Sequence, residues 1–140
     1  LRGMETEFGA NRLVMDKFFA VQPMAAAPGR AVEIAKALAG RPDFDWRNPN
    51  RFRALVGAFA AGNLAGFHRA DGAGYRFATD WLIRLDPANP QTAARVTNVF
   101  GTWRMFDAGR QALMRAELER LAATPGLSRD TGEIVGRLLG

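Results

Sequence analysis

The sequence contains no cysteine and only one histidine among its 140 residues. Without cysteine the chain can form neither a disulfide nor a zinc or iron–sulfur site held by thiolates. A single histidine cannot supply the two ligands of an H-E-x-x-H zinc motif. No stretch approaches the roughly 18 continuous apolar residues of a membrane span. The lack of cysteine, of a second histidine and of a long apolar run therefore excludes the commonest metal sites and a membrane-spanning segment.

Lysine is also scarce, because seventeen of the nineteen basic residues are arginine. The net charge of +5 is compatible with a nucleic-acid partner. However, the arginines alternate with acidic residues instead of clustering, as in the segment 115–120. We therefore expect a solvated surface of mixed charge. The alternative is a free-standing helical scaffold that binds an acidic protein or nucleic acid through its arginines.

Apolar residues recur with helical spacing along nearly the whole chain, and no run alternates as a half-buried strand does. In the first helix, at about 11–22, the predicted apolar stripe is Val14, Phe18 and Val21, and Pro23 ends the helix. Asn48-Pro49 and Asn89-Pro90 each place a capping side chain before a proline at the first helical position. Helices are predicted at about 11–22, 29–39, 49–62, 64–68, 77–85, 90–106, 108–121 and 128–139.

About eight helices joined by short loops predict an all-α fold with antiparallel neighbours. The two Asn-Pro starts are 41 residues apart, within the period of HEAT-like helical pairs. We expect one domain over residues 11–140, built of stacked hairpins in a right-handed, HEAT-like superhelix. Residues 1–10 are expected to lie outside that domain.

Two local features invite a catalytic interpretation, and a structural one is favoured for both. His68 has no neighbouring nucleophile to activate, so we expect it to pack or to form a hydrogen bond. The loop from Asp71 to Gly74 has two glycines but lacks the Lys-Ser/Thr of a phosphate-binding loop. It is predicted to be a turn before a helix.

The helix predicted at 90–106 carries a narrow polar stripe beside its apolar face, made of Gln91, Arg95, Asn98 and Thr102. Such a stripe is usually the solvated rim of a core, but Arg95 and Gln91 one turn apart also offer forked donors to a carboxylate. Two further candidates, Arg51 and Arg53, lie at the start of the helix predicted at 49–62, where a helix N-terminus attracts anions.

Five ordered blocks carry a more specific signal, at residues 13–22, 48–59, 67–75, 89–95 and 107–114. Together they resemble the C-terminal domain of bacterial aminopeptidase N, a zinc metallo-aminopeptidase of the M1 type, also called alanyl aminopeptidase. The resemblance covers about residues 11–139. It implies that the parent enzyme, a cytoplasmic hydrolase, releases N-terminal amino acids from peptides. Its zinc would be held in a separate catalytic domain.

The resemblance also implies a role for this part of the chain. It would be a helical superhelix that caps the active-site cavity, restricts access to it and has no metal or catalytic residue of its own. Gln91 and Arg95 match two family positions on the cavity wall that face the departing part of the peptide, and Arg53 and Arg51 are weaker candidates for the same wall. The expected partners are the other domains of the parent chain and a peptide, not nucleic acid.

Overall fold

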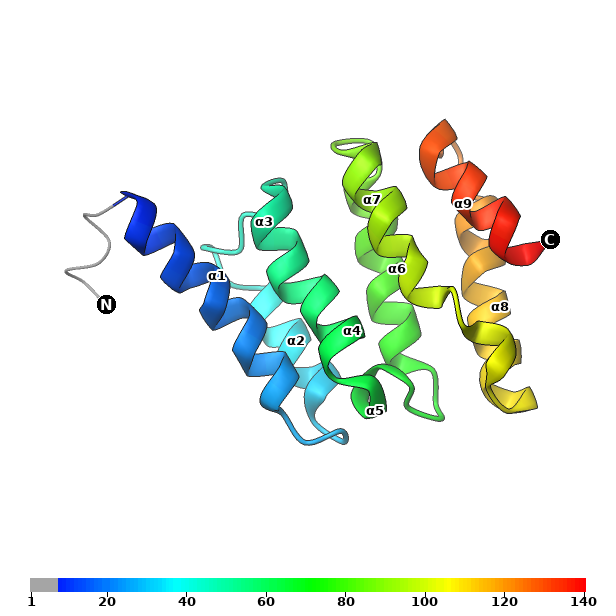
Figure 1. Ribbon diagram of the computed structural model, residues 1–140, viewed down its shortest axis with the longest axis horizontal. Helices are drawn as coiled ribbons and strands as arrows, with labels where there is room; N and C mark the ends of the chain where they lie inside the picture. The colour runs from blue at the N-terminus through cyan, green and yellow to red at the C-terminus, as the bar shows by residue number, and fades with distance from the viewer. Residues whose placement is uncertain (1–7) are drawn as a thin grey trace.

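The computed structural model describes residues 8–140, in which every regular element is helical. The helices stack in two layers (Figure 1). The nearer layer in this view contains α1 (Phe8–Ala25), a rod of α3 (Pro49–Phe52), η2 (Arg53–Gly57) and α4 (Ala58–Gly62), then α7 (Pro90–Thr97) and α9 (Arg129–Leu139). The farther layer contains α2 (Ala31–Ala39), α6 (Ala73–Leu85) and α8 (Ala108–Ala122). Short elements connect them: α5 (Leu64–Phe67), η3 (Asn98–Phe100) and η4 (Trp103–Met105).

The all-α prediction is therefore confirmed, with α1 packed on α2, α6 on α7, and α8 on α9. The segments α3, η2 and α4 follow one another without a break and form the single helix expected at 49–62. Within it, η2 is one wider π-helical turn that begins at Arg53. Residues 1–7 of the segment predicted to lie outside the domain are beyond the described part of the chain, whereas residues 8–10 belong to α1.

Both Asn-Pro starts act as predicted. The Asn48 side chain accepts hydrogen bonds from the backbone N–H groups of Asn50 and Arg51, and Asn89 accepts one from Thr92. Each asparagine thus satisfies donors that a helix start leaves without an intrahelical acceptor. The helices that follow, α3 and α7, begin where the sequence predicted.

The end of the first helix was predicted wrongly, because α1 continues through Pro23 to Ala25. The side-chain amide of Asn63 donates to the carbonyl oxygens of Pro23 at 2.9 Å and of Ala26 at 2.8 Å. This buried amide satisfies carbonyl groups at the end of α1, where a helix has no donors of its own. Asn63 also accepts from the N–H of Gly66, so one side chain joins α1 to the start of α5.

The face that α1 turns to the core also differs from the prediction. Phe19 is fully buried, and its ring lies 5.5 Å from that of Phe44. Val21, which was predicted to be part of the buried stripe, is 53% exposed. The stripe is therefore centred on Phe19, and Val21 falls on the outer side of the helix.

The end of the helix expected at 90–106 was also predicted wrongly, because α7 ends at Thr97. The Thr97 hydroxyl bonds the carbonyl of Ala93 at 2.7 Å, and the chain then tightens into η3 and turns at Gly101 before η4. A side chain that bonds the preceding turn in this way competes with regular helix geometry. The polar stripe is therefore broken, and Thr102 no longer shares a face with Gln91 and Arg95.

The core runs between the two layers and is rich in aromatic rings, as the helical spacing predicted. Phe67 lies at its centre, with edge-on contacts to Phe59 at 6.1 Å and Tyr75 at 5.1 Å. Such edge-to-face pairs add to the gain from apolar burial. The fully buried aromatic side chains are Phe19, Phe52, Phe59, Phe67, Tyr75 and Phe100.

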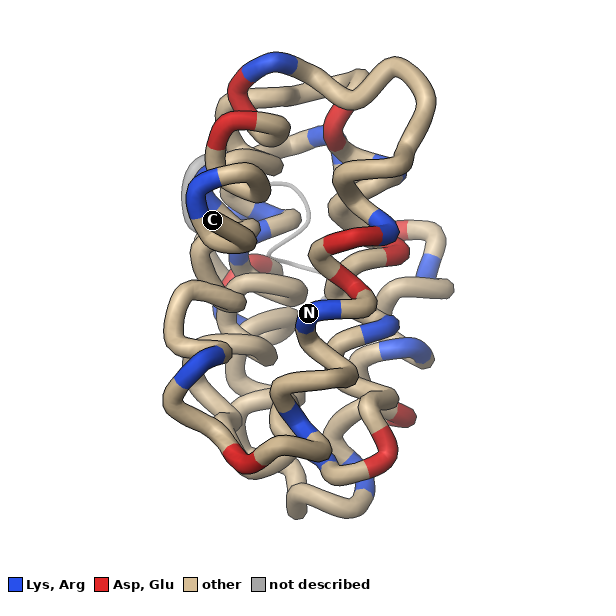
Figure 2. Tube along the Cα trace, turned by 90° about the vertical axis from the view of Figure 1, so that its right-hand side faces the viewer, with Lys and Arg blue, Asp and Glu red and all other residues tan. Residues whose placement is uncertain are grey.

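The charged residues are mixed on the surface, as expected from the sequence. In the view from the C-terminal end of the stack, basic and acidic positions are scattered among one another over the trace (Figure 2). Several of them form short ion pairs, such as Arg120 with Glu117 at 2.8 Å and Arg69 with Asp71 at 2.7 Å. None of the helices in residues 8–140 has the length and apolar character needed to cross a membrane.

Candidate functional site

Gln91 and Arg95 line a surface pocket of about 390 Å³ between α7 and α9, which we call the α7–α9 pocket. Both side chains are exposed. They lie one turn apart on α7, whose opposite face is held in the core by Ala93 and Val96. The pocket is completed by other residues of the same two helices: Ala94, Asp130, Glu133 and Ile134.

Helix α9 is fixed beside α7 by a buried carboxylate that the sequence did not single out. Asp86, 2% exposed, accepts hydrogen bonds from the backbone N–H of Ser128 at 2.7 Å and from its hydroxyl at 2.6 Å. The Thr131 hydroxyl donates a third bond at 2.5 Å. At the other end of α9, the Trp103 indole donates to the carbonyl of Leu138 at 3.0 Å. Both ends of the helix that forms one pocket wall are thus tied to the rest of the domain.

The other two predicted arginines are not part of this pocket. The buried Arg51 side chain donates to Asp16 Oδ1 and to the carbonyl of Asp43, both at 2.6 Å, and so holds the rod against α1. Arg53 is exposed and bonds the neighbouring Asn50 side chain at 2.8 Å. The structure therefore brings Gln91 and Arg95 together and leaves Arg51 and Arg53 elsewhere.

The arginine in the pocket is free to meet a ligand. In the described part of the chain, no ion pair or side-chain hydrogen bond engages the Arg95 guanidinium or the Gln91 amide. Asp130 likewise has no ion-pair partner among residues 8–140, while Glu133 pairs with Arg129 at 3.0 Å. The acidic side of the pocket was missed from the sequence, because the packing of α9 on α7 cannot be deduced from spacing.

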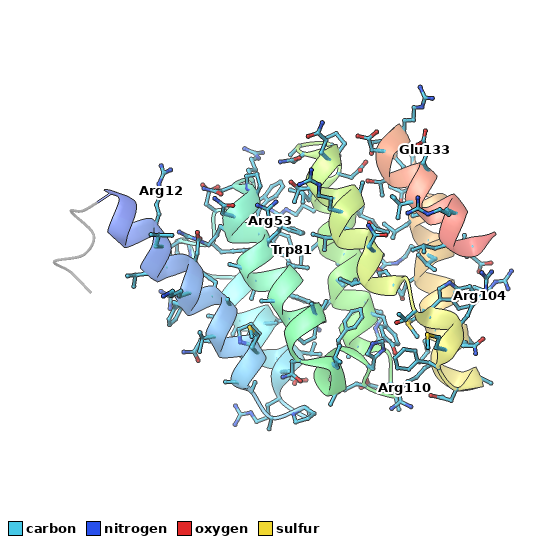
Figure 3. All side chains as sticks on the ribbon, viewed as in Figure 1. Arg12, Arg53, Trp81, Arg104, Arg110 and Glu133 are labelled. Atoms are coloured by element: carbon cyan, nitrogen blue, oxygen red, sulfur yellow. The ribbon has the colours of Figure 1, made fainter. Side chains whose placement is uncertain are left out.

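A larger pocket, of about 610 Å³, lies at the other end of the helices and is mainly apolar. It is lined by Leu64, Ala65, His68, Thr102, Phe106 and Arg110. In Figure 3, Arg110 marks this end and Glu133 the end that carries the α7–α9 pocket. Thr102 was expected beside Arg95, and the break after Thr97 places it here instead.

His68 has the packing role expected for it. Its ring stacks on Phe106 with centroids 4.1 Å apart, and Nδ1 shares a 2.6 Å hydrogen bond with the Tyr75 hydroxyl. Burial and then the charge of Arg110 lower the pKa of His68 from its ordinary value of 6.5. Burial also raises the pKa of Tyr75 to about 12. The pair is thus held neutral inside an apolar wall.

The lowered pKa of His68 predicts a loss of stability in mild acid. A histidine that takes up a proton more readily when unfolded stabilises the fold above its unfolded pKa and loses that contribution as the pH falls. We expect the free energy of unfolding to drop between about pH 8 and about pH 5.5, around the ordinary histidine pKa. The drop should be smaller in His68→Gln. Urea titrations at a series of pH values would measure it, and equal drops in both proteins would contradict the assignment.

No group of three or more histidine, cysteine, aspartate or glutamate side chains within residues 8–140 is placed to hold a metal ion. His68, the one histidine, uses Nδ1 on Tyr75 and stacks against Phe106. The residues described do not fit a zinc site.

Within residues 12–140, large apolar side chains are exposed on α1, at the start of α5 and in η4. On α1 they are Leu13, Val21 and Met24, which are 65%, 53% and 46% exposed. Leu64 at the start of α5 is 62% exposed and Met105 in η4 is 82% exposed. None of these five side chains belongs to the core cluster of the described residues.

Comparison with known proteins places this geometry in a family. The family described as a domain of unknown function (DUF3458_C) with ARM repeats matches residues 1–140. The chain is 46% identical to aminopeptidase N of Haemophilus influenzae over 140 residues, covering 99% of this chain and 16% of that protein. It is 47% identical to aminopeptidase N of Caulobacter vibrioides over 128 residues, covering 91% of this chain and 15% of that protein.

A solved structure shares the fold. Aminopeptidase A of Legionella pneumophila, crystallised in complex with aspartic acid, aligns with a TM-score of 0.84 and 33% identity. The alignment covers 96% of this chain and 15% of that one. This chain therefore spans only about one sixth of the length of these relatives. It belongs to the DUF3458_C family of ARM-repeat domains, and it is similar to a segment of bacterial aminopeptidase N.

Proposed function

We propose that this chain is the C-terminal capping domain of an M1-type zinc aminopeptidase, which closes over the active-site cavity and limits which peptides reach it. The observation that carries the proposal is the α7–α9 pocket, where Arg95 and Gln91 lie together, exposed and without partners in residues 8–140. The similarity to aminopeptidase N supports it.

The chemistry of these two side chains suits a peptide that extends away from the reacting bond. A guanidinium donates two parallel hydrogen bonds to a carboxylate, and an amide can donate to a backbone carbonyl. Holding the far end of a substrate in this way orients it for a reaction elsewhere. Because the described residues do not fit zinc, we place the zinc and the bond cleavage in the rest of the parent protein, and we propose that this chain alone is inactive.

The exposed apolar residues suggest how the domain is seated. Leu13, Val21 and Met24 are exposed apolar side chains of α1. This helix lies at one end of the stack (Figure 1). Apolar surface of this kind is typical of a protein interface. We propose that it contacts other domains of the parent chain, and that the exposed Leu64 and Met105 extend this interface.

The test is Arg95→Ala in the full-length aminopeptidase. We expect KM for peptides with a free C-terminal carboxylate to rise about tenfold or more, the effect of losing a hydrogen bond to a charged group worth about 1.5–3 kcal/mol. Small aminoacyl amide reporters, which are too short to reach the pocket, should keep their KM. Steady-state kinetics with both substrate classes would measure this.

A suitable control is Arg115→Ala, which removes an exposed arginine of α8 that pairs with Glu119 at 3.3 Å. Arg115→Ala should leave KM unchanged for both substrate classes. An equal rise in KM for peptides and reporters in Arg95→Ala would remove Arg95 from peptide binding.

A further inference from the structure

The α7–α9 pocket has charges of both signs. Arg95 and Gln91 come from α7, and Asp130 and Glu133 come from α9. An anion site alone would not need two carboxylates in its wall, since each repels the anion that Arg95 attracts. The pocket is therefore suited to a ligand that is itself both negative and positive.

The carboxylates are available to such a ligand. Asp130 has no ion-pair partner in the described chain, and Glu133 meets only Arg129, with side chains 66% and 90% exposed. An exposed i,i+4 pair of this kind is weak and exchanges readily with solvent or another cation. Glu133 lies at the end of α9 that faces the start of α7, as its position in Figure 3 shows.

Two backbone donors at the start of α9 are already engaged within the domain. The N–H of Ser128 is bonded to Asp86, and the N–H of Thr131 is bonded to the Ser128 hydroxyl at 3.2 Å. Among the side chains that line the pocket, Arg95 and Gln91 are the donors for an anion, and the α9 wall presents its carboxylates.

Resting on the function proposed above, we infer that Asp130 and Glu133 select peptides with a basic residue at the end held by Arg95. In such a residue the terminal carboxylate and the side chain branch from the same Cα atom. When the carboxylate is bonded to Arg95 and Gln91, a lysine or arginine side chain can extend toward the α9 wall. An acidic side chain there meets two carboxylates and is disfavoured.

The experiment compares peptides of two to five residues that end in lysine or in Nε-acetyl-lysine, using the full-length aminopeptidase. Acetylation removes the charge and keeps the four-carbon stem of the side chain, to which it adds a small acetyl group. For at least one peptide length, we expect kcat/KM to be about two- to fivefold higher with a terminal lysine than with a terminal Nε-acetyl-lysine. This is the size of effect expected from an exposed ion pair. The preference should shrink as ionic strength rises from about 0.05 M to about 0.5 M, because salt screens exposed charges.

The double variant Asp130→Asn/Glu133→Gln should lose this preference. Glu119→Gln is the matched control, since Glu119 is an exposed glutamate that pairs with Arg115 at i,i+4 just as Glu133 pairs with Arg129. It should keep the preference. A preference that is absent in the native enzyme at every length, or unchanged in the double variant, overturns the inference.

The two proposals fail in different ways. If Arg95→Ala raises KM for peptides while the double variant leaves the lysine preference unchanged, only the inference about Asp130 and Glu133 fails. If Arg95→Ala leaves KM unchanged for both peptides and reporters, the proposed function fails and the inference fails with it.

Discussion

Asp86→Ala is expected to lower the free energy of unfolding by about 3 kcal/mol, because it leaves three donors without their shared acceptor. These donors are the N–H and hydroxyl of Ser128 and the hydroxyl of Thr131, all within 2.7 Å of the carboxylate. Asp86 is 2% exposed, so water cannot fully replace it without opening the contact between the end of α6 and the start of α9. Urea denaturation followed by circular dichroism would measure the change.

The control for this prediction is a nearby carboxylate. Asp80 lies within α6, whereas Asp86 follows its last residue, and Asp80 is 62% exposed and pairs at 2.9 Å with Arg120, which is itself partly exposed. Asp80→Ala should therefore cost about 1 kcal/mol or less. Equal losses in the two variants would mean that the hydrogen bonds of Asp86 to α9 do not stabilise the fold.

Asp86 also illustrates which features could not be predicted from the sequence, namely contacts between residues far apart along the chain. The features read correctly were local, such as the capping side chain and proline of Asn89-Pro90, whose partner Thr92 is three residues away. The partners of Asp86 are 42 and 45 residues away along the chain. No spacing rule pairs such residues, so the sequence alone does not indicate that Asp86 is buried and bonded to Ser128 and Thr131.

Long-range contacts also explain the wrongly predicted end of α1 and the unexpected partner of Arg51. A proline usually ends a helix, as was expected of Pro23. Here Asn63, 40 residues later, donates hydrogen bonds to the carbonyl oxygens of Pro23 and Ala26, and α1 continues to Ala25. Arg51 was considered an anion-binding residue because it lies at a helix start, yet Asp16, 35 residues earlier, engages it. In both cases a tertiary contact decided what a local pattern could not.

Only half of the residues discussed in the candidate site were predicted from the sequence. Gln91 and Arg95 lie within one turn of one helix, so periodicity alone placed them side by side. Asp130 and Glu133 belong to another helix, and only the packing of α9 against α7 brings them to the same pocket. The positive side of the pocket was accessible from the sequence, and the negative side required the fold.

Gly74→Ala is expected to destabilise the domain by about 3 kcal/mol, although helix propensity alone predicts a gain of about 1 kcal/mol. A Cβ atom at this position in α6 would lie 2.8 Å from the Cα atom and 2.9 Å from the carbonyl carbon of Phe67, and it would collide with the Phe67 carbonyl oxygen. Phe67 cannot move aside easily, since its ring is fully buried between Phe59, Tyr75 and Phe100. Urea denaturation would measure the loss.

Gly136→Ala is the matched control, because it makes the same substitution inside a helix without the contact. A Cβ atom at Gly136 in α9 would have no neighbour within 4 Å. Here the lower backbone entropy of alanine in the unfolded chain should stabilise the protein by about 0.5–1 kcal/mol. The opposite signs at the two positions follow from one difference, the close approach of α6 to the backbone of Phe67. If alanine stabilised the protein at both positions, α6 would have to lie farther from Phe67 than the structure places it.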